Sequence, residues 1–318
     1  MAFLLLALPA ALEGQTCYSG SEMDAASKAA IDNAASHFLS LSKNGDVAGL
    51  RANSIPALSG DFSSIEQAVV TNKDALGAAP PTLVGSYLLD ASDAKAPLSR
   101  ADFYCGIYNS PDRTAFYIPN LPPGRYALVI QKVNGKNPIT LSLVLQNVGG
   151  AWKLAGFYPR QDSIAGHNGD WYLNKARQDK AQGKLHDAWF NYLTAWDLTA
   201  PVNFMSTPQL DKVASEMQSS RPSDMPSESA PLSLTANGKT FRVTELSAVP
   251  VDNKLDLRVR YQNPNAGDSN IAFQDNMAVI RAIVAKYPEV RDTFDAVIAR
   301  AVNGGQEYGS LLPMKDIK

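Results

Sequence analysis

The chain has 318 residues, of which 45% are hydrophobic and 19% are charged, and its formal net charge is −2. This length predicts two or three domains rather than one. Binding to a polyanion needs clustered Lys and Arg, and the chain has no basic run, so we expect no nucleic-acid partner. No apolar stretch reaches the ~18 residues that a spanning helix needs, so we also expect no membrane span.

The first residues carry the apolar run Phe3–Leu12, FLLLALPAAL, followed by small and polar residues. Such a run is typical of the hydrophobic region of a secretory signal and is too short to span a membrane. A buried helix is the alternative, but Pro9 interrupts the run. We therefore predict a signal peptide over residues 1–16 and an exported protein, periplasmic or secreted. No basic residue precedes the run, so we expect the translation start to lie upstream of Met1.

The chain has two cysteines. Cys17 follows the predicted signal peptide, and Cys105 lies in a predicted strand. Because two thiols in an oxidising compartment usually pair, we predict a Cys17–Cys105 disulfide. A bacterial lipoprotein would also place a cysteine here. However, Thr16 is not the small residue expected directly before that cysteine, and Gly14 stands where a Leu is expected.

Residues 17–160 change from helical to strand periodicity. Apolar residues recur every three or four positions between Met23 and Leu41, and shorter helices are predicted near 47–53 and 64–76. After Pro80 the period falls to two, with turn residues between six candidate strands. These strands are 82–90, 102–108, 114–118, 125–133, 139–147 and 152–158. Helices followed by an antiparallel meander predict an α+β domain whose curved sheet wraps around the helices.

The last predicted strand pair, LSLVLQNVGGAWKLAGFY, carries a recognisable pattern. It resembles the closing hairpin of the nuclear transport factor two-like (cystatin-like) superfamily. The matching residues are Trp152, Lys153, Leu154, Gly156 and Phe157. The resemblance covers about residues 20–160 and implies a cone-shaped cavity, in a family that includes enzymes, ligand binders and scaffolds.

Asp102 and Tyr104 are the candidate acid/base pair for such a cavity. They lie two residues apart and therefore share one face of the predicted strand 102–108. A carboxylate at the rim and a packing tyrosine are the simpler interpretation.

Residues 161–218 predict a helical hairpin with one additional helix. Asp170 can cap the first helix, which ends at Gly183, and Pro201 ends the second. The hairpin resembles a single tetratricopeptide repeat. The matching residues are Gly183, Ala188, Tyr192, Ala195 and Pro201. Lys175 and Asp179 depart from the repeat, which prefers Leu and an aromatic residue there.

One repeat cannot bury its own face, so we expect the hairpin to pack on a flanking domain and on a helix over residues 207–218. Five aromatic residues form the possible helical interface. They are Trp171, Tyr172, Trp189, Tyr192 and Trp196. Packing is the simpler interpretation of these side chains, and a ligand groove is the alternative.

Residues 219–231, SSRPSDMPSESAP, are rich in Ser and Pro and are predicted to be a linker that buries little. Residues 232–318 predict a small α+β domain. Strands are expected at 232–235, 240–246, 255–261 and 308–314, and helices from about Phe273 and from Pro288 to Gly304.

Arg258 and Arg260 alternate with apolar residues, which indicates a solvated strand face rather than a phosphate site. The three histidines, His37, His167 and His186, share no metal-ligand spacing, and no standard nucleophile, phosphate-binding or zinc-protease motif occurs. We therefore predict no catalytic residue, no metal site and no cofactor.

The preferred hypothesis is an exported non-enzymatic binding or assembly protein of the bacterial cell envelope. Its expected partner is another envelope protein or a small apolar ligand. The alternative is an isomerase-, dehydratase- or hydrolase-type enzyme that uses the cone-shaped cavity of the first domain.

Overall fold

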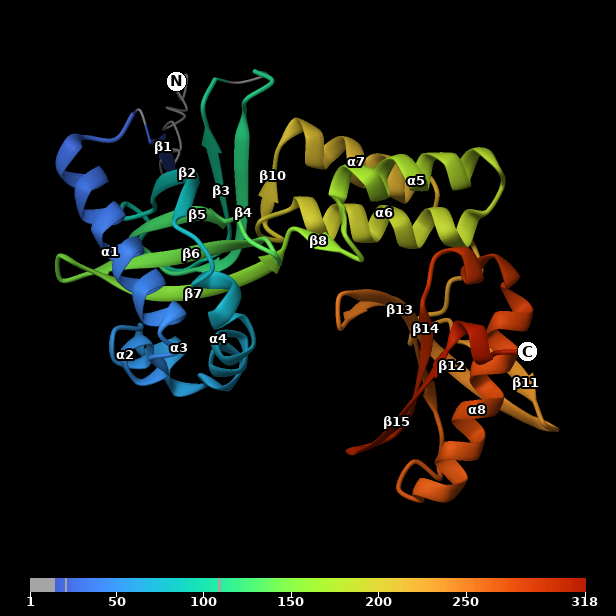
Figure 1. The fold of residues 1–318 in the computed structure, drawn as a ribbon. Helices are drawn as coiled ribbons and strands as arrows, with labels where there is room; N and C mark the ends of the chain where they lie inside the picture. Colours follow the sequence, from blue (N-terminus) through green and yellow to red (C-terminus); the bar gives the residue numbers. More distant parts are fainter. Residues whose placement is uncertain (1–14, 21, 108–109) are drawn as a thin grey trace, which may run out of the picture. The chain divides into compact units, whose positions relative to one another are not determined.

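The computed structural model describes residues 15–20, 22–107 and 110–318 (Figure 1). The predicted signal peptide, residues 1–16, therefore lies almost entirely outside the described residues. The predicted α+β class is confirmed, because helices and sheets alternate along the whole described chain. The chain divides into two compact units. Unit 1 ends at Arg160 and also contains Pro201–Pro208, whereas unit 2 contains Gln161–Ala200 and Gln209–Lys318.

Unit 1 begins with a short strand and a group of helices, and most of its strands follow. The helices are α1 (Ala25–Lys43), α2 (Val47–Ala52), α3 (Pro56–Gly60) and α4 (Ser63–Leu76). The strands are β1 (Thr16–Ser19), β2 (Pro81–Asp90), β3 (Leu98–Cys105), β4 (Thr114–Leu121), β5 (Arg125–Val133), β6 (Ile139–Val148), β7 (Ala151–Gln161) and β10 (Met205–Ser206). The short helix α3, which starts with proline at its first turn, was not predicted.

The strands of unit 1 form a five-stranded sheet of order β1-β2-β5-β6-β7 and a three-stranded sheet of order β10-β4-β3. The predicted single meander is therefore wrong, because β2 pairs directly with β5 and the β3–β4 hairpin lies outside the larger sheet. The reason is apolar burial. Phe103 of β3 and Phe116 of β4 are opposite each other and fully buried, so their hairpin packs on the larger sheet instead of forming part of it.

The larger sheet has an apolar core on each face. Side chains alternate along β5, so Ala127 and Val129 belong to the core shared with α1 and α4, while Leu128 and Ile130 belong to the core shared with β3 and β4. This explains why β5 is buried along most of its length. Residues 201–208 join unit 1 through β10, which pairs with β4 at Phe116. The predicted hairpin module, residues 161–218, is therefore divided between the two units.

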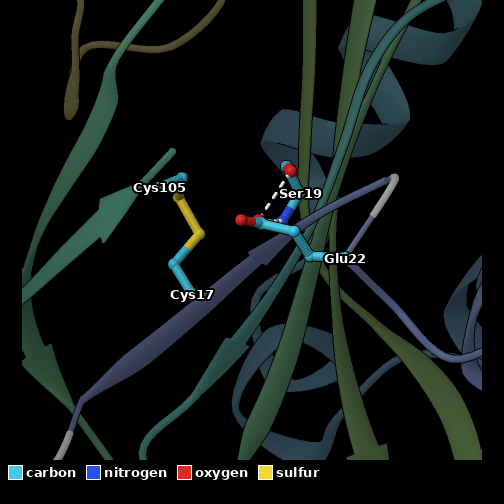
Figure 2. The surroundings of a disulfide bond; sticks show 4 residues. All are labelled: Cys17, Ser19, Glu22 and Cys105. Atoms are coloured by element: carbon cyan, nitrogen blue, oxygen red, sulfur yellow. Dashed lines mark hydrogen bonds between the residues drawn. A yellow bond between two sulfur atoms is a disulfide. The ribbon is translucent and has the colours of Figure 1, made fainter. Parts of the chain in front are cut away.

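The predicted disulfide joins Cys17 of β1 to Cys105 at the end of β3, with 5.1 Å between the two Cα atoms (Figure 2). β1 pairs with β2 at the edge of the larger sheet, so the disulfide connects that edge to the smaller sheet. Close by, Glu22 accepts hydrogen bonds from the backbone N–H and the hydroxyl of Ser19, at 2.8 and 2.7 Å. These bonds lower the pKa of the Glu22 carboxyl and stabilise the turn after β1.

Replacing Cys105 with Ser should lower the melting temperature of unit 1. The disulfide spans 88 residues, and loss of a closed loop of this length corresponds to about 4–5 kcal/mol in the chain-entropy model. Thermal unfolding of the oxidised chain, with and without reductant, measures the effect. The matched control is the double variant Cys17→Ser/Cys105→Ser, whose melting temperature should not respond to reductant. If the oxidised parent has two alkylatable thiols, the disulfide is not formed in solution.

Unit 2 contains the helical hairpin and a second α+β layer. Its helices are α5 (Gly169–Ala181), α6 (Leu185–Thr199), α7 (Pro208–Gln218), α8 (Ser269–Lys286) and the 3-10 helices η1 (Pro288–Asp292) and η2 (Met314–Asp316). Its strands are β8 (Ser163–Ile164), β9 (His167–Asn168), β11 (Leu232–Ala236), β12 (Lys239–Val251), β13 (Lys254–Gln262), β14 (Ala296–Asn303) and β15 (Gln306–Pro313). The N-cap of α5 is Asn168, whose side chain accepts from the N–H of Trp171 at 3.0 Å, and the predicted cap Asp170 lies in the first turn.

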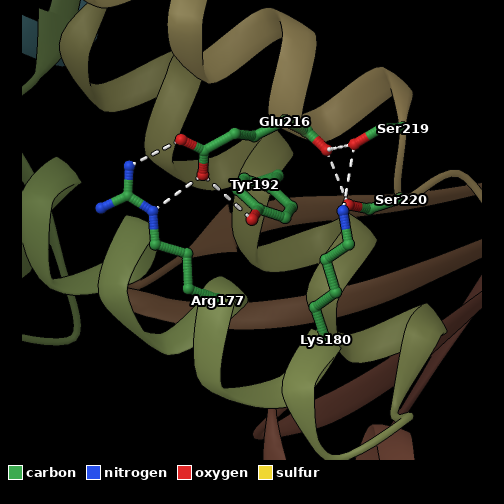
Figure 3. Close-up of polar contacts among 6 residues, drawn as sticks. All are labelled: Arg177, Lys180, Tyr192, Glu216, Ser219 and Ser220. Carbon is green, nitrogen blue, oxygen red and sulfur yellow. Dashed lines mark hydrogen bonds and ion pairs between the residues drawn. The ribbon is translucent and has the colours of Figure 1, made fainter.

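Helix α7 covers one side of the hairpin (Figure 3). Arg177 of α5 donates two hydrogen bonds to the Glu216 carboxylate, at 2.7 and 2.8 Å, and Tyr192 of α6 donates a third at 3.2 Å. Lys180 donates to the Ser219 hydroxyl at 3.0 Å. Underneath these polar contacts, Ala176, Ala188 and Tyr192 form a small buried core against which Met217 packs. The small alanines allow the helices to approach closely, and the tyrosine fills the remaining space.

The five-stranded sheet of unit 2 has the order β11-β12-β13-β14-β15. The predicted helix from Pro288 to Gly304 is wrong, because only η1 is helical and the chain then forms β14 and β15. Val297, Ala299 and Ala301 alternate with more exposed residues, and β14 pairs in parallel with β13. Helix α8 connects these parallel strands, and Gly304 has a φ of 59° in the turn between β14 and β15. Tertiary pairing thus overrides the helical spacing.

The predicted linker, residues 219–231, also differs from the structure. Ser220, Pro222 and Pro226 are buried, and Met225 packs against the main core of unit 2. That same core contains Trp189 and Phe190 of the hairpin together with strands of the C-terminal layer. The hairpin, the Ser/Pro-rich segment and residues 232–318 therefore form one unit rather than two domains and a linker.

A fragment containing only residues 232–318 should fail to fold cooperatively. Phe294 packs against Phe190 of α6 with 5.2 Å between ring centroids, and removal of the hairpin would expose this face of the core. Hydrophobic-dye binding and amide exchange of the fragment test this, and residues 161–318 serve as the matched longer fragment. A cooperative thermal transition of residues 232–318 alone would contradict the one-unit assignment.

A polar pocket beside the helical hairpin as the candidate functional site

The five aromatic residues predicted as a helical interface point to different surroundings. Tyr172 and Trp189 are buried in the main core of unit 2, Tyr192 belongs to the small core under α7, and Trp196 is half-buried. Packing is therefore the role of most of them. Trp171 differs, because its side chain is 41% exposed.

Trp171 lies on a pocket of about 280 Å³ within unit 2. One wall comes from α5 and the β8–β9 hairpin, and the other comes from the end of η1 and the residues before β14. The side chains that determine its character are His167, Trp171, Lys175, Asn191, Arg291 and Asp295. The pocket is therefore aromatic at one wall and carries both signs of charge elsewhere.

The aromatic wall is held in one position by the local backbone. Ala165 and Gly166 have φ values of 52° and 77°, which allow the tight turn between β8 and β9. The N–H of Ala165 donates to the carbonyl of Asn253 at 3.0 Å and so ties this turn to the β12–β13 hairpin. His167 then stacks on Trp171 with 3.7 Å between centroids and 9° between ring planes. An exposed indole is thus held in one position.

The charged part of the pocket lies next to a buried polar network. Lys175 forms an ion pair with Asp179, which is only 1% exposed. The Asn191 side-chain N–H donates to Asp179 at 2.9 Å and to the Thr293 hydroxyl at 3.5 Å. Lys175 and Asp179 are the residues that depart from the tetratricopeptide pattern. Their departure now has a physical reason, since they form this network instead of an apolar contact.

Asp187 lies one helical turn before Asn191 and is fully buried, and neither carboxylate oxygen has a hydrogen-bond partner of normal geometry. Burial raises the pKa of the Asp187 carboxyl to about 7; the negative charges of Asp179 and Glu289 add to the rise, and the Thr293 hydroxyl opposes it. The charge of Lys175 also opposes the rise but does not offset burial, and a buried carboxyl without a hydrogen-bonded cation is costly in its charged form. No local pattern indicates this burial, because Asp187 resembles an ordinary acidic residue in the first turn of a helix.

His186 belongs to a second polar cluster at the start of α6. Its Nδ1 lies 2.7 Å from Glu289 and its Nε2 lies 2.9 Å from Asp224. Tyr287 stacks beside the ring at 4.1 Å and donates to Asp224 at 2.9 Å. Burial alone would raise the pKa of Asp224, but these hydrogen bonds outweigh it and hold the pKa below its ordinary value. The cluster fixes the Ser/Pro-rich segment to the hairpin and is structural.

The candidate acid/base pair of unit 1 is not enclosed. Phe103 and Cys105 point into the core, so Asp102 and Tyr104 point the other way, and Tyr104 is 59% exposed. Asp102 pairs with Arg100 at 2.6 Å. The space between the helices and the larger sheet is filled by side chains such as Phe38, Val69 and Leu141. In the described part of unit 1, no Asp, Glu, Lys, Arg or His side chain is buried.

Comparison with protein-family models, with curated proteins and with solved structures gives no match. Across residues 15–20, 22–107 and 110–318, no helix is both long and apolar enough to cross a membrane. In the same residues, no three His, Cys, Asp or Glu side chains are grouped so that they could hold a metal ion.

Replacing Asp187 with Asn should stabilise unit 2 at pH 8 but not near pH 4. The folded-state pKa of about 7 lies above the ordinary value of 3.8, so the stabilisation from the protonated group is complete below pH ~4 and is lost as the pH rises through ~7. The difference between variant and parent should therefore grow across this interval to at most about 4 kcal/mol.

Tryptophan fluorescence during thermal unfolding measures this, because three of the four tryptophans, at 171, 189 and 196, lie in unit 2. Asp93→Asn, at an exposed turn, is the matched control and should show no such pH dependence. If the difference in stability between Asp187→Asn and the parent stays constant from pH 4 to pH 8, burial does not raise the pKa of this carboxyl.

Proposed function

We propose that this chain is an exported, non-enzymatic binding or assembly protein of the bacterial cell envelope, and that unit 2 binds a protein partner at the Trp171 pocket. The Cys17–Cys105 disulfide supports export, because such bonds persist in oxidising compartments and are rare in the reducing cytosol. The N-terminal apolar run supports it independently. In this proposal, unit 1 is a nuclear transport factor two-like scaffold, and the hairpin of unit 2 is a tetratricopeptide-like module.

The exposure of Trp171 is the observation that carries the proposal. Tryptophan and arginine are enriched among the residues that dominate protein–protein binding energy, and Trp171 and Arg291 line the same pocket. An exposed indole in water costs free energy that a partner would recover by covering it. The stack on His167 removes much of the rotational freedom that binding would otherwise have to restrict.

The charges of the pocket set the expected partner chemistry. Lys175 already pairs with Asp179, and Arg291 donates to the carbonyl of Ile317 at 3.0 Å, so both cations are partly satisfied within the unit. Asp295 is exposed and lines the same pocket as Trp171. A partner segment with an apolar side chain for Trp171 and a basic side chain for Asp295 fits this arrangement best.

A photo-crosslinking amino acid at position 171 in the exported full chain should give one discrete protein adduct in intact cells. Phe273 of α8 is the matched control, since it is 43% exposed and also lies in unit 2. Crosslinkers there should not give that adduct. In the chain that carries the crosslinker at position 171, the additional substitution Asp295→Lys should reduce the adduct several-fold, because it reverses the charge that the partner meets. Equal adducts from positions 171 and 273, or no effect of Asp295→Lys, would contradict the proposal.

A further inference from the structure

A second and larger pocket lies at the other end of the C-terminal layer of unit 2. β13 and β14 are parallel and are joined through α8, so their C-terminal ends lie at the same edge of the sheet. Such edges are the usual location of ligand sites in sheets with parallel strands. A pocket of about 510 Å³ lies there, lined by residues that include Arg260, Gln262, Asn263, Val302 and Asn303. This volume is within the range of small-molecule sites.

The rim of this pocket is rigid. The N–H of Asn263 donates to the carbonyl of Val302 at 3.0 Å, and the Asn303 side chain donates to the carbonyl of Pro264 at 3.1 Å. These bonds join the two strand ends directly. Asn263 also donates to the buried Asp275 at 3.1 Å. The pocket is thus fixed by the sheet and by α8 rather than by a loose loop.

Arg260 is the cation of the pocket, and it differs from its neighbours. Arg258 donates to Glu245 at 2.7 Å, and Arg300 donates to Glu307 at 3.1 Å. Arg260 is half-buried and lies opposite Arg300 on β14 and opposite Glu245 on β12. Glu245 already accepts from Arg258, and the guanidinium of Arg260 forms no hydrogen bond or ion pair with any residue that the structure describes. Two arginines in adjacent positions repel each other, and a bound carboxylate would relieve this repulsion.

Glu228 supplies the opposite charge. It comes from the Ser/Pro-rich segment and lines the same pocket as Arg260. Its carboxylate is exposed and likewise pairs with no side chain among the described residues, Arg260 included. The backbone carbonyl of Glu228 accepts from Arg242 at 3.4 Å, which connects this residue to β12. The lining of the pocket therefore contains a cation and an anion that do not pair with each other.

We propose that this pocket binds a small zwitterion, namely a free amino acid or a short unblocked peptide. The carboxylate of the ligand pairs with Arg260, whose planar guanidinium suits two parallel hydrogen bonds. The ammonium group of the ligand pairs with Glu228. The exposed side-chain amide of Gln262 lines the same pocket and can hydrogen-bond to the ligand backbone. This site is distinct from the Trp171 pocket and does not depend on the protein-binding function proposed there.

Isothermal titration of the full exported chain with four forms of trialanine tests the proposal. The forms are the free peptide, the N-acetylated peptide, the C-terminal amide and the doubly blocked peptide. The free peptide should bind most tightly, each singly blocked form should bind at least tenfold more weakly, and the doubly blocked form should not bind. Equal binding of the free and doubly blocked peptides would overturn the proposal, as would no binding of the free peptide or of any of the twenty amino acids.

Two charge-removing variants assign the contacts. Arg260→Gln should abolish the preference for a free carboxylate, and Glu228→Gln should abolish the preference for a free ammonium group. Arg300→Gln is the matched control, because Arg300 lies in register with Arg260 but pairs with Glu307, and it should leave both preferences in place. Unchanged preferences in Arg260→Gln or Glu228→Gln, in chains with the parent melting temperature, would contradict the assignment of that residue.

Discussion

Burial of helix α6 is the constraint on which the architecture of unit 2 depends. More than half of its fifteen residues are buried, and they point to more than one side of the helix. A helix buried on several sides needs several partners. α7 covers the side of Tyr192 and Ala188, and the C-terminal layer covers the side of Trp189 and Phe190. The hairpin, α7 and the sheet can therefore form only together, which is why a single repeat-like hairpin is stable in this chain.

The same burial produces the unusual electrostatics of unit 2. Asp187, Asn191 and Thr194 follow each other along one face of α6 and are all buried. The Asn191 side chain donates to Asp179 and the Thr194 hydroxyl donates to the carbonyl of Phe190, whereas neither carboxylate oxygen of Asp187 has a hydrogen-bond partner of normal geometry. Asp187 is buried because the neighbouring residues of α6 are buried. Its raised pKa is thus a consequence of packing.

In unit 1, the constraint is the larger sheet. This sheet has apolar side chains on both faces, so it needs cover on both. Helices α1 and α4 cover one face and the β3–β4 hairpin covers the other. The disulfide then joins the edge strand β1 to the end of β3 and holds the N-terminal strand in place. This arrangement leaves no buried charged side chain in the described part of unit 1, whereas unit 2 carries both pockets considered above.

Local patterns in the sequence determined the α+β class, most helices and strands, and the pairing of the two cysteines. These features depend on residue spacing, on turn residues and on there being a single possible disulfide. Tertiary structure alone decided three others. β14 is a strand because β13 offers it parallel hydrogen bonds, although Phe294, Val297 and Ala301 have helical spacing. The Ser/Pro-rich segment packs against the hairpin because Asp224 forms hydrogen bonds with His186 and Tyr287. Arg260 and Glu228, 32 residues apart by their numbers, line one pocket because sheet topology brings together segments that no local pattern connects.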